Sequence, residues 1–137
     1  MSPLADHGMR AAHAPRVLVV DDELLIRWSL RETLSDRGYA VAEAEDGRTA
    51  VRVLTAGAEL PDVVLLDYRL PDSDDLALLS RIVSLVPDGR VILMTAYGTP
   101  EVAQAALERG AFRVLLKPFE MQDLTALVGR VVDARPC

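Results

Sequence analysis

Four short runs of consecutive apolar residues stand out along the chain. They have the length of strands and no polar alternation: Val17 to Val20, Val63 to Leu66, Val91 to Met94 and Val114 to Leu116. Such runs are typical of strands buried on both faces of a parallel sheet. A fifth segment, Tyr39 to Ala44, is less apolar and carries Glu43 near its end. This composition favours a strand at the edge of the sheet.

Stretches of helical length separate these runs, with apolar residues three and four positions apart. Two examples are Ile26, Leu30, Thr33 and Leu34, and later Leu124, Leu127, Val128 and Val131. This spacing predicts amphipathic helices. The chemistry of helix ends agrees, with a start at Thr99, Pro100 and Glu101 and stops at Gly38 and Gly110. Alternating strands and helices predict a doubly wound α/β fold, a five-stranded parallel sheet with helices on both faces.

Composition and charge limit the classes of function. The chain has 137 residues, enough for about one domain, and is 50% hydrophobic and 26% charged, as in ordinary globular proteins. We expect a flexible leader at residues 1–15, one domain at residues 16–134 and a short tail at residues 135–137. The net charge of −6 argues against nucleic acid or a membrane surface as a direct partner. With a single cysteine and no signal-peptide or membrane-spanning run, we expect a cytoplasmic protein.

Acidic residues follow two of the predicted strands. Asp21 and Asp22 end the first strand and Asp67 ends the third. In the common strand order 2-1-3-4-5 these two strands are neighbours, so three carboxylates converge on the edge where open parallel sheets bind ligands. Unpaired anions at this spacing require a cation, and carboxylate oxygens select Mg²⁺, with Mn²⁺ as a substitute.

Lys117 ends the fifth strand and is the only lysine of the chain, beside fourteen arginines. A compact ammonium on a flexible stem suits pairing with a carboxylate and then with a phosphoryl oxygen. An ordinary ion pair at the sheet edge is the alternative interpretation. The three acids, together with Thr95 at the end of the fourth strand, favour the functional one.

Four segments carry a family resemblance: VLVVDDE, PDVVLLDYRLPDSD, VILMTAYG and GAFRVLLKPF. With these motifs at these spacings, the sequence from Arg16 to about Ala134 resembles the receiver domain of two-component response regulators. The segments IRWSL and MTAYGT look most similar to receivers of nitrogen-regulatory-type enhancer-binding activators. The resemblance implies a flavodoxin-like (βα)5 fold.

The resemblance also implies residue roles. Asp67 would accept a phosphoryl group from a histidine kinase or a histidine phosphotransfer protein. Asp22, Asp67 and the backbone carbonyl of Arg69 would bind Mg²⁺ directly, and Asp21 would bind it through water. Lys117 and Thr95 would hold the phosphoryl oxygens. The domain would catalyse only its own phosphorylation and slow dephosphorylation, so it would not be an enzyme acting on other substrates.

Further family features surround these residues. Small Ala96 would leave room for the phosphoryl group, and Pro118 would follow a cis peptide bond. Arg69 and Tyr97 occupy the two positions that modulate loss of the phosphoryl group in the family. Because both are large enough to obstruct an attacking water, we predict a long-lived acyl phosphate.

Three positions depart from the family pattern. Val114 replaces the usual aromatic switch residue and Arg113 replaces the acid before it, so switching would either depend on Thr95 and backbone shifts or be weaker. Asp75 replaces a loop glycine, at the end of the acidic run Asp72 to Asp75. We expect this run to be a solvated loop that caps the third helix, although its anions could also tune metal affinity.

Leu24 and Trp28 lie nearly opposite the buried face of the first predicted helix, beside the acidic edge. We interpret them as part of the surface on which the phosphoryl donor docks. A downstream protein, not identified by the sequence, and a second copy of the chain are further candidate partners.

Two other functions are compatible with parts of the pattern. A phosphorylation-independent pseudo-receiver scaffold would explain Val114 and Asp75, but the intact Asp22, Asp67, Thr95 and Lys117 oppose it. A Mg²⁺-dependent aspartyl phosphohydrolase would need a second acid two residues after its nucleophile, and Arg69 occupies that position.

Overall fold

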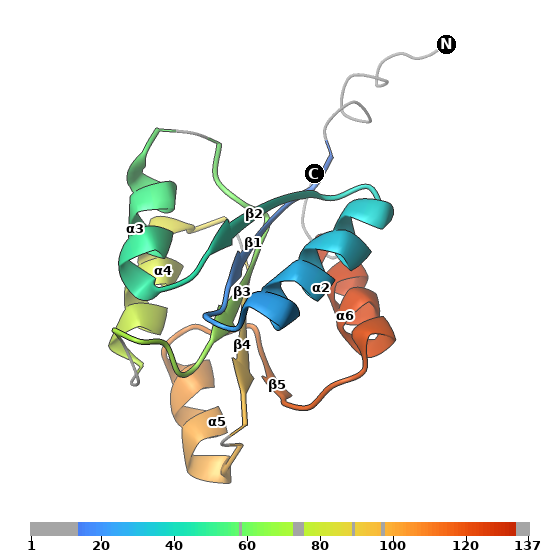
Figure 1. Cartoon of the computed structure of the whole chain (residues 1–137). Coiled ribbons are helices and arrows are strands. Elements are labelled where there is room, and N and C mark those ends of the chain that lie inside the picture. Colours follow the sequence, from blue (N-terminus) through green and yellow to red (C-terminus); the bar gives the residue numbers. More distant parts are fainter. Residues whose placement is uncertain (1–13, 58, 73–75, 89, 97, 134–137) are drawn as a thin grey trace.

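The computed structural model describes residues 14–57, 59–72, 76–88, 90–96 and 98–133. Most of the predicted leader and the whole predicted tail lie outside these ranges. Within them, five strands and five helices alternate along the chain (Figure 1).

The strands form one parallel sheet in the order β2-β1-β3-β4-β5. Their bounds are β1 Arg16–Val20, β2 Ala40–Ala44, β3 Val63–Asp67, β4 Arg90–Thr95 and β5 Arg113–Leu116. This arrangement confirms the predicted strand order and the position of the less apolar second strand at an edge. Because β1 and β3 are neighbours, their carboxyl ends lie side by side.

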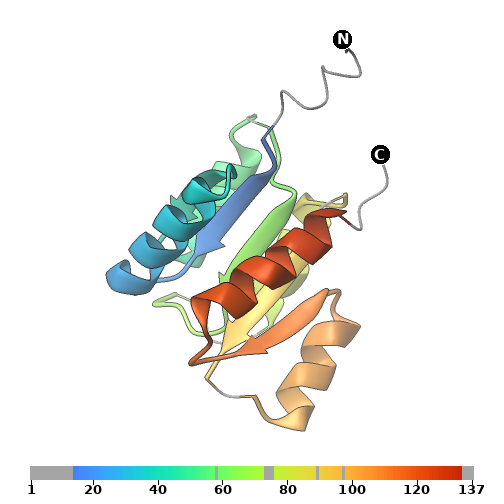
Figure 2. The same ribbon diagram turned by 90° about the vertical axis from the view of Figure 1, so that its right-hand side faces the viewer.

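The helices cover both faces of the sheet. Their bounds are α2 Leu24–Asp36, α3 Gly47–Thr55, α4 Ala77–Leu85, α5 Pro100–Glu108 and α6 Met121–Asp133. Helices α2 and α6 lie on one face, and α3, α4 and α5 lie on the other (Figures 1 and 2). The predicted doubly wound, flavodoxin-like architecture is therefore confirmed.

Alternate residues of the central strands supply two apolar cores. Leu18, Val64 and Leu93 pack under α3, α4 and α5, whereas Val19, Leu65 and Ile92 pack under α2 and α6. All five residues of β3 are buried, as expected of a strand covered on both faces. The residues that follow a central strand consequently start from a rigid backbone.

Local signals at the helix ends act as predicted. The Thr99 side chain accepts a hydrogen bond from the Val102 amide at the start of α5, with Pro100 in the first turn. Gly38 and Gly110 have φ values of 91° and 107°, a left-handed conformation that glycine adopts without strain. The peptide bond between Lys117 and Pro118 is cis, as the family resemblance implies.

Candidate functional site

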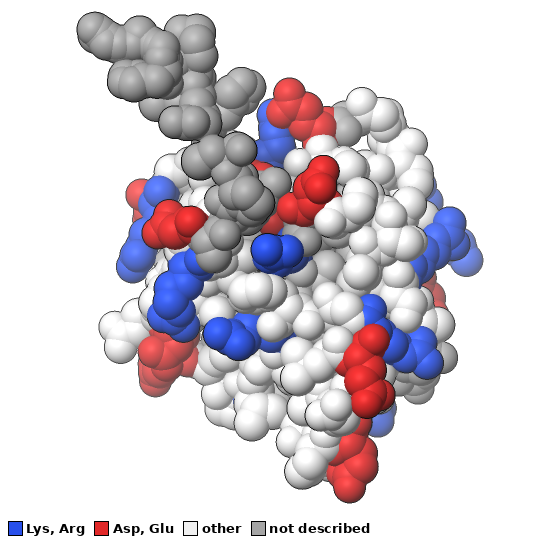
Figure 3. Space-filling model, turned by 180° about the vertical axis from the view of Figure 1, so that it is seen from behind, with Lys and Arg blue, Asp and Glu red and all other residues white. Residues whose placement is uncertain are grey.

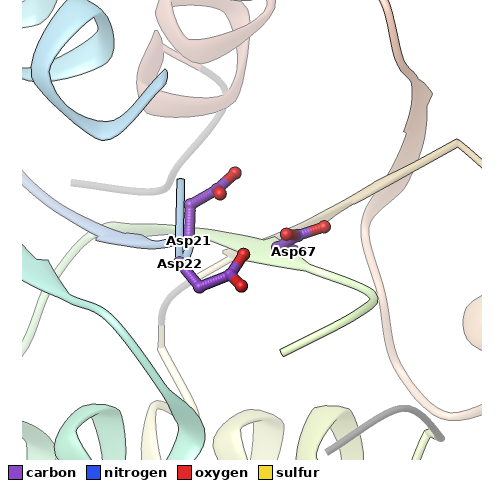
Figure 4. Close-up of side chains that lie close together, drawn as sticks. All are labelled: Asp21, Asp22 and Asp67. Atoms are coloured by element: carbon purple, nitrogen blue, oxygen red, sulfur yellow. The ribbon is translucent and has the colours of Figure 1, made fainter. Parts of the chain in front are cut away.

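Three carboxylates meet where β1 and β3 end. Asp21 and Asp22 directly follow β1, and Asp67 is the last residue of β3. Oxygens of the three side chains lie within 4.8 Å of one another. Figure 4 shows the three side chains close together where the two strands end. The convergence predicted from strand order is thus present.

Asp21 is the most firmly held of the three acids. Its side chain is fully buried. Its amide donates to the Ala44 carbonyl of β2, and its Oδ1 accepts from the Glu23 amide at 2.9 Å. Its Oδ2 accepts from Lys117 Nζ at 3.1 Å. Asp22, in contrast, is exposed and faces the open side of the cluster.

Lys117 joins the acids from the end of β5. Its Nζ lies 3.1 Å from Asp21 Oδ2, 3.3 Å from Asp67 Oδ1 and 3.6 Å from Glu23 Oε1. Burial alone would lower the pKa of Lys117, but the charges of Asp21 and Asp67 outweigh it and raise the pKa above its ordinary value. The ammonium therefore stays charged. One cation faces three carboxylates within 3.6 Å, which leaves the pocket with negative charge.

The pKa of Asp67 is raised by its surroundings in this pocket. Burial, and next the charge of Asp21, raise its pKa to about 6, although Lys117 and the Arg69 backbone amide act in the opposite direction. Part of the Asp67 population is consequently protonated at neutral pH while no further cation is bound. A divalent cation bound beside Asp67 would offset the repulsion from Asp21 and favour the ionised carboxylate.

A cavity of about 240 Å³ opens over the cluster. Its lining residues are Asp22, Glu23, Asp67, Tyr68, Arg69, Thr95, Ala96 and Lys117. Thr95 is buried at the end of β4, and the exposed Ala96 follows it at the rim. Acidic residues, a lysine and a threonine therefore line one cavity at the strand ends.

A wider groove of about 450 Å³ continues from this cavity along α2. Glu23, Ala96 and Lys117 border both spaces, and Leu25 and Phe119 belong to the groove alone.

Large apolar side chains stand at the start of α2. Leu24 is 71% exposed, Leu25 73% and Trp28 54%. The predicted exposure of Leu24 and Trp28 is confirmed, and Leu25 joins them. An apolar surface thus adjoins the acidic pocket.

The remaining predicted residues are more scattered. Val114 lies in the middle of β5 and packs against the core under α3, α4 and α5 rather than in the cavity. Tyr97 and Asp75 lie outside the residues that the structure describes.

The expectation that the acidic run caps the third helix is wrong for Asp72. Its carboxylate instead accepts from the Gly47 and Arg48 amides at 2.9 and 3.0 Å, at the start of α3, the second helix.

Sequence reasoning missed two contacts near the pocket. Glu23 was not singled out, yet its Oε1 lies 3.6 Å from Lys117 Nζ. Arg27 was not singled out, although its Nη1 donates to the Asp21 carbonyl at 2.8 Å. A basic residue in the first turn of a helix that directly follows three acids is the signal that could have directed attention to it.

The fold and the pocket together define a class of protein. It is a doubly wound α/β domain with an acidic pocket at the strand ends, where three carboxylates that could hold a hard divalent cation lie beside a lysine. In the ranges that the structure describes, no helix is long and apolar enough to cross a membrane.

Comparison with known proteins gives the family. Residues 17–129 match the model of the response regulator receiver domain, and the chain belongs to this family of signalling domains. It is 40% identical over 115 residues to the DNA-binding transcriptional regulator NtrC of Klebsiella pneumoniae. That match covers 84% of this chain but 24% of the relative, so the chain spans about a quarter of its length. The predicted likeness to nitrogen-regulatory receivers is confirmed.

Two further relatives are of similar length to the chain. Sporulation initiation phosphotransferase F of Bacillus subtilis is 37% identical over 120 residues, which cover 88% of this chain and 95% of the relative. A crystal structure of a CheY-like receiver domain protein from Methanospirillum hungatei JF-1 superposes with a TM-score of 0.82 at 28% identity. The superposition covers 88% of this chain and 95% of that one.

Proposed function

We propose that residues 16–134 form a phosphorylatable receiver domain and that Asp67 is the phosphoacceptor. The donor is a histidine kinase or a histidine phosphotransfer protein. The observation that carries the proposal is the buried Asp67, 3.3 Å from Lys117 and within 4.8 Å of two further acids. This combination supports a nucleophile that becomes reactive when a cation neutralises its neighbours.

The reaction is a transfer of one phosphoryl group. A carboxylate oxygen of Asp67 forms a bond to phosphorus while the bond from phosphorus to the donor imidazole nitrogen breaks, and the histidine leaves as neutral imidazole after taking up a proton. Lys117 and the Thr95 hydroxyl hold phosphoryl oxygens, and small Ala96 leaves room at the rim. Val114, without an aromatic ring, leaves the conformational response to Thr95 and the backbone.

The acids suit Mg²⁺, with Mn²⁺ as a substitute. Asp22, Asp67 and the Arg69 carbonyl are the proposed direct ligands, and Asp21 acts through water. Their hard oxygen donors and the raised pKa of Asp67 support this assignment. A bound Mg²⁺ would supply the neutralisation of charge between the anionic nucleophile and the phosphoryl oxygens.

The donor docks beside the pocket, on Leu24 and Trp28. Their exposed apolar side chains support a contact with a helix of the donor, and the groove lined by Phe119 and by Leu25 of the same helix start offers further apolar surface. The downstream partner is a protein or a second copy of the chain rather than nucleic acid. The net charge of −6 and the mixed acidic and basic side chains over one face of the molecule (Figure 3) support this choice.

Intact-mass spectrometry tests the acceptor. The protein is incubated with acetyl phosphate and Mg²⁺, and we expect one added phosphate that Asp67→Asn abolishes. The control is Asp36→Asn, which removes an exposed acid at the end of α2 and should leave labelling unchanged. Absence of labelling, with no Mg²⁺ binding, would instead favour the scaffold, and turnover of added phosphoesters would favour the hydrolase.

A further inference from the structure

Arg27 occupies an unfavourable position for a basic residue. It is the fourth residue of α2, in a helix start that has no acidic residue in its first turn. The partial positive charge of a helix N-terminus disfavours a cation there. A residue whose charge is unfavourable for its own helix is expected to make a contact elsewhere that has a functional or structural role.

The contacts of Arg27 lead to the acidic pocket. Its side chain is 14% exposed. Nη1 donates to the backbone carbonyl of Asp21 at 2.8 Å, and Nε donates to Glu43 Oε1 of β2 at 3.0 Å. Glu43 stands opposite Val19 in the sheet, so one guanidinium joins α2, the end of β1 and the edge strand.

These contacts fix the peptide that links two of the acids. The Asp21 amide is bound to the Ala44 carbonyl, and the Asp21 carbonyl is bound to Arg27. The first hydrogen bond holds the peptide plane before Asp21, and the bond from Arg27 holds the peptide plane between Asp21 and Asp22. Because the Asp22 side chain is exposed, its direction depends mainly on this backbone.

We propose that Arg27 is a positioning residue for the metal ligands. It orients the peptide between Asp21 and Asp22 and so aims Asp22 at the cation, while Glu43 holds the guanidinium away from the carboxylates. The inference rests on the proposed function, since it concerns the same Mg²⁺ site. It assigns Arg27 no contact with the metal or the phosphoryl group.

A positioning role and simple charge repulsion predict opposite changes in Mg²⁺ affinity when Arg27 is replaced. Arg27 is a cation near a cation site, so removing its charge would strengthen Mg²⁺ binding if electrostatics alone mattered. Removing a positioning residue would weaken it, by about tenfold as is usual for groups that orient metal ligands. The sign of the change therefore separates the two effects.

Arg31 provides a matched control. It lies one turn further along α2, and its Nη1 contacts the same Glu43 at 3.2 Å, but its side chain is 55% exposed. Arg27→Met and Arg31→Met each remove one positive charge and one contact with Glu43. Only Arg27→Met removes the hydrogen bond to the Asp21 carbonyl.

Titration calorimetry with MgCl₂ measures the dissociation constant of each folded variant below its unfolding temperature. We expect Arg27→Met to weaken Mg²⁺ binding about tenfold and Arg31→Met to stay within about twofold of wild type. In the metal-free protein, the Glu23 amide, which bonds to Asp21 Oδ1, should exchange with solvent faster in Arg27→Met alone. Equal effects of the two variants, or tighter binding in Arg27→Met, would overturn the inference.

Two safeguards keep the test decisive. If wild type itself bound no Mg²⁺, the proposed function would fail before the role of Arg27 was tested. If Arg27→Met did not fold, Arg27→Lys would replace it, because one ammonium cannot reproduce the two-pronged contact with Asp21 and Glu43. Arg27→Lys should then bind Mg²⁺ more weakly than wild type, and an unchanged dissociation constant would reject the assignment.

Discussion

Lys117 Nζ lies 3.3 Å from Asp67 Oδ1, although their strands, β5 and β3, are separated by β4. The lysine side chain crosses the end of β4 to reach the acid. This contact lowers the pKa of Asp67, while burial and Asp21 raise it to a net value of about 6. The lysine thus keeps the acid more ionised than its burial alone would allow.

Replacing Lys117 tests this balance. In metal-free protein, Lys117→Met should move the pKa of Asp67 above its present value of about 6, because the opposing attraction is lost. Lys117→Arg, which keeps the charge, should change it less. Carboxyl NMR titration of Asp67 measures both values. An unchanged midpoint in Lys117→Met would contradict the electrostatic role.

Ionised Asp67 should destabilise the metal-free fold. Its pKa is raised from 3.8 to about 6, so the folded state binds the proton more tightly than the unfolded state. Below pH 3.8 both states are protonated. As pH rises through 6, stability is lost on the order of 1 to 2 kcal/mol.

Asp67→Asn should remove that loss. Denaturant unfolding without metal should find the variant more stable than wild type at pH 8, with the gain vanishing toward pH 4. Added Mg²⁺ should stabilise wild type and narrow the difference, because it binds the folded state. A gain independent of pH would refute the assigned cause.

Trp28→Ala should slow phosphotransfer from the cognate protein donor about tenfold, because a half-exposed aromatic at an interface often carries much of the binding energy. Labelling by acetyl phosphate should be unchanged. Leu107→Ala, at a 47% exposed leucine of α5, serves as the control. Rapid-quench kinetics distinguishes the outcomes, and equal slowing with both donors would remove the docking role.

Arg69 should protect the acyl phosphate. It lines the cavity over Asp67, where a large side chain obstructs the approach of water. Arg69→Ala, and Tyr97→Ala likewise, should shorten the lifetime of the phosphorylated protein several-fold, as followed by loss of the added mass. Arg81→Ala, at an exposed position of α4, should not. Unchanged decay in both variants would discard the prediction.

Asp72, in the loop that follows Asp67 and β3, should stabilise α3. Asp72→Ala should lower the free energy of unfolding by about 1 kcal/mol and speed exchange of the Gly47 and Arg48 amides. Asp46→Ala removes the cap on the Thr49 amide of the same helix and should speed that amide instead. Identical exchange patterns in the two variants would contradict the assignment of different helix amides to Asp72 and Asp46.

Periodicity and strand ends were sufficient to predict the sheet and the meeting of Asp21, Asp67 and Lys117, because a buried parallel sheet leaves few topologies and aligns its carboxyl ends. The pattern could not reveal the pairing of Arg27 with Glu43. The sequence indicated only that Glu43 suits an edge strand, whereas its partner depends on how α2 crosses the sheet. Asp72 was assigned to the wrong helix for the same reason, since the sequence does not say which helix start a loop side chain will reach.

The three ion pairs of Lys117 have a practical consequence. Besides the terminal amine, this side chain is the sole target for amine-directed reagents, and three carboxylates hold it with 14% of its surface exposed. Acylation of Lys117 Nζ should be slow in the native protein and faster when its ion pairs with the carboxylates are broken. A second mass increment, beyond that of the terminal amine, would then report that Lys117 has become accessible.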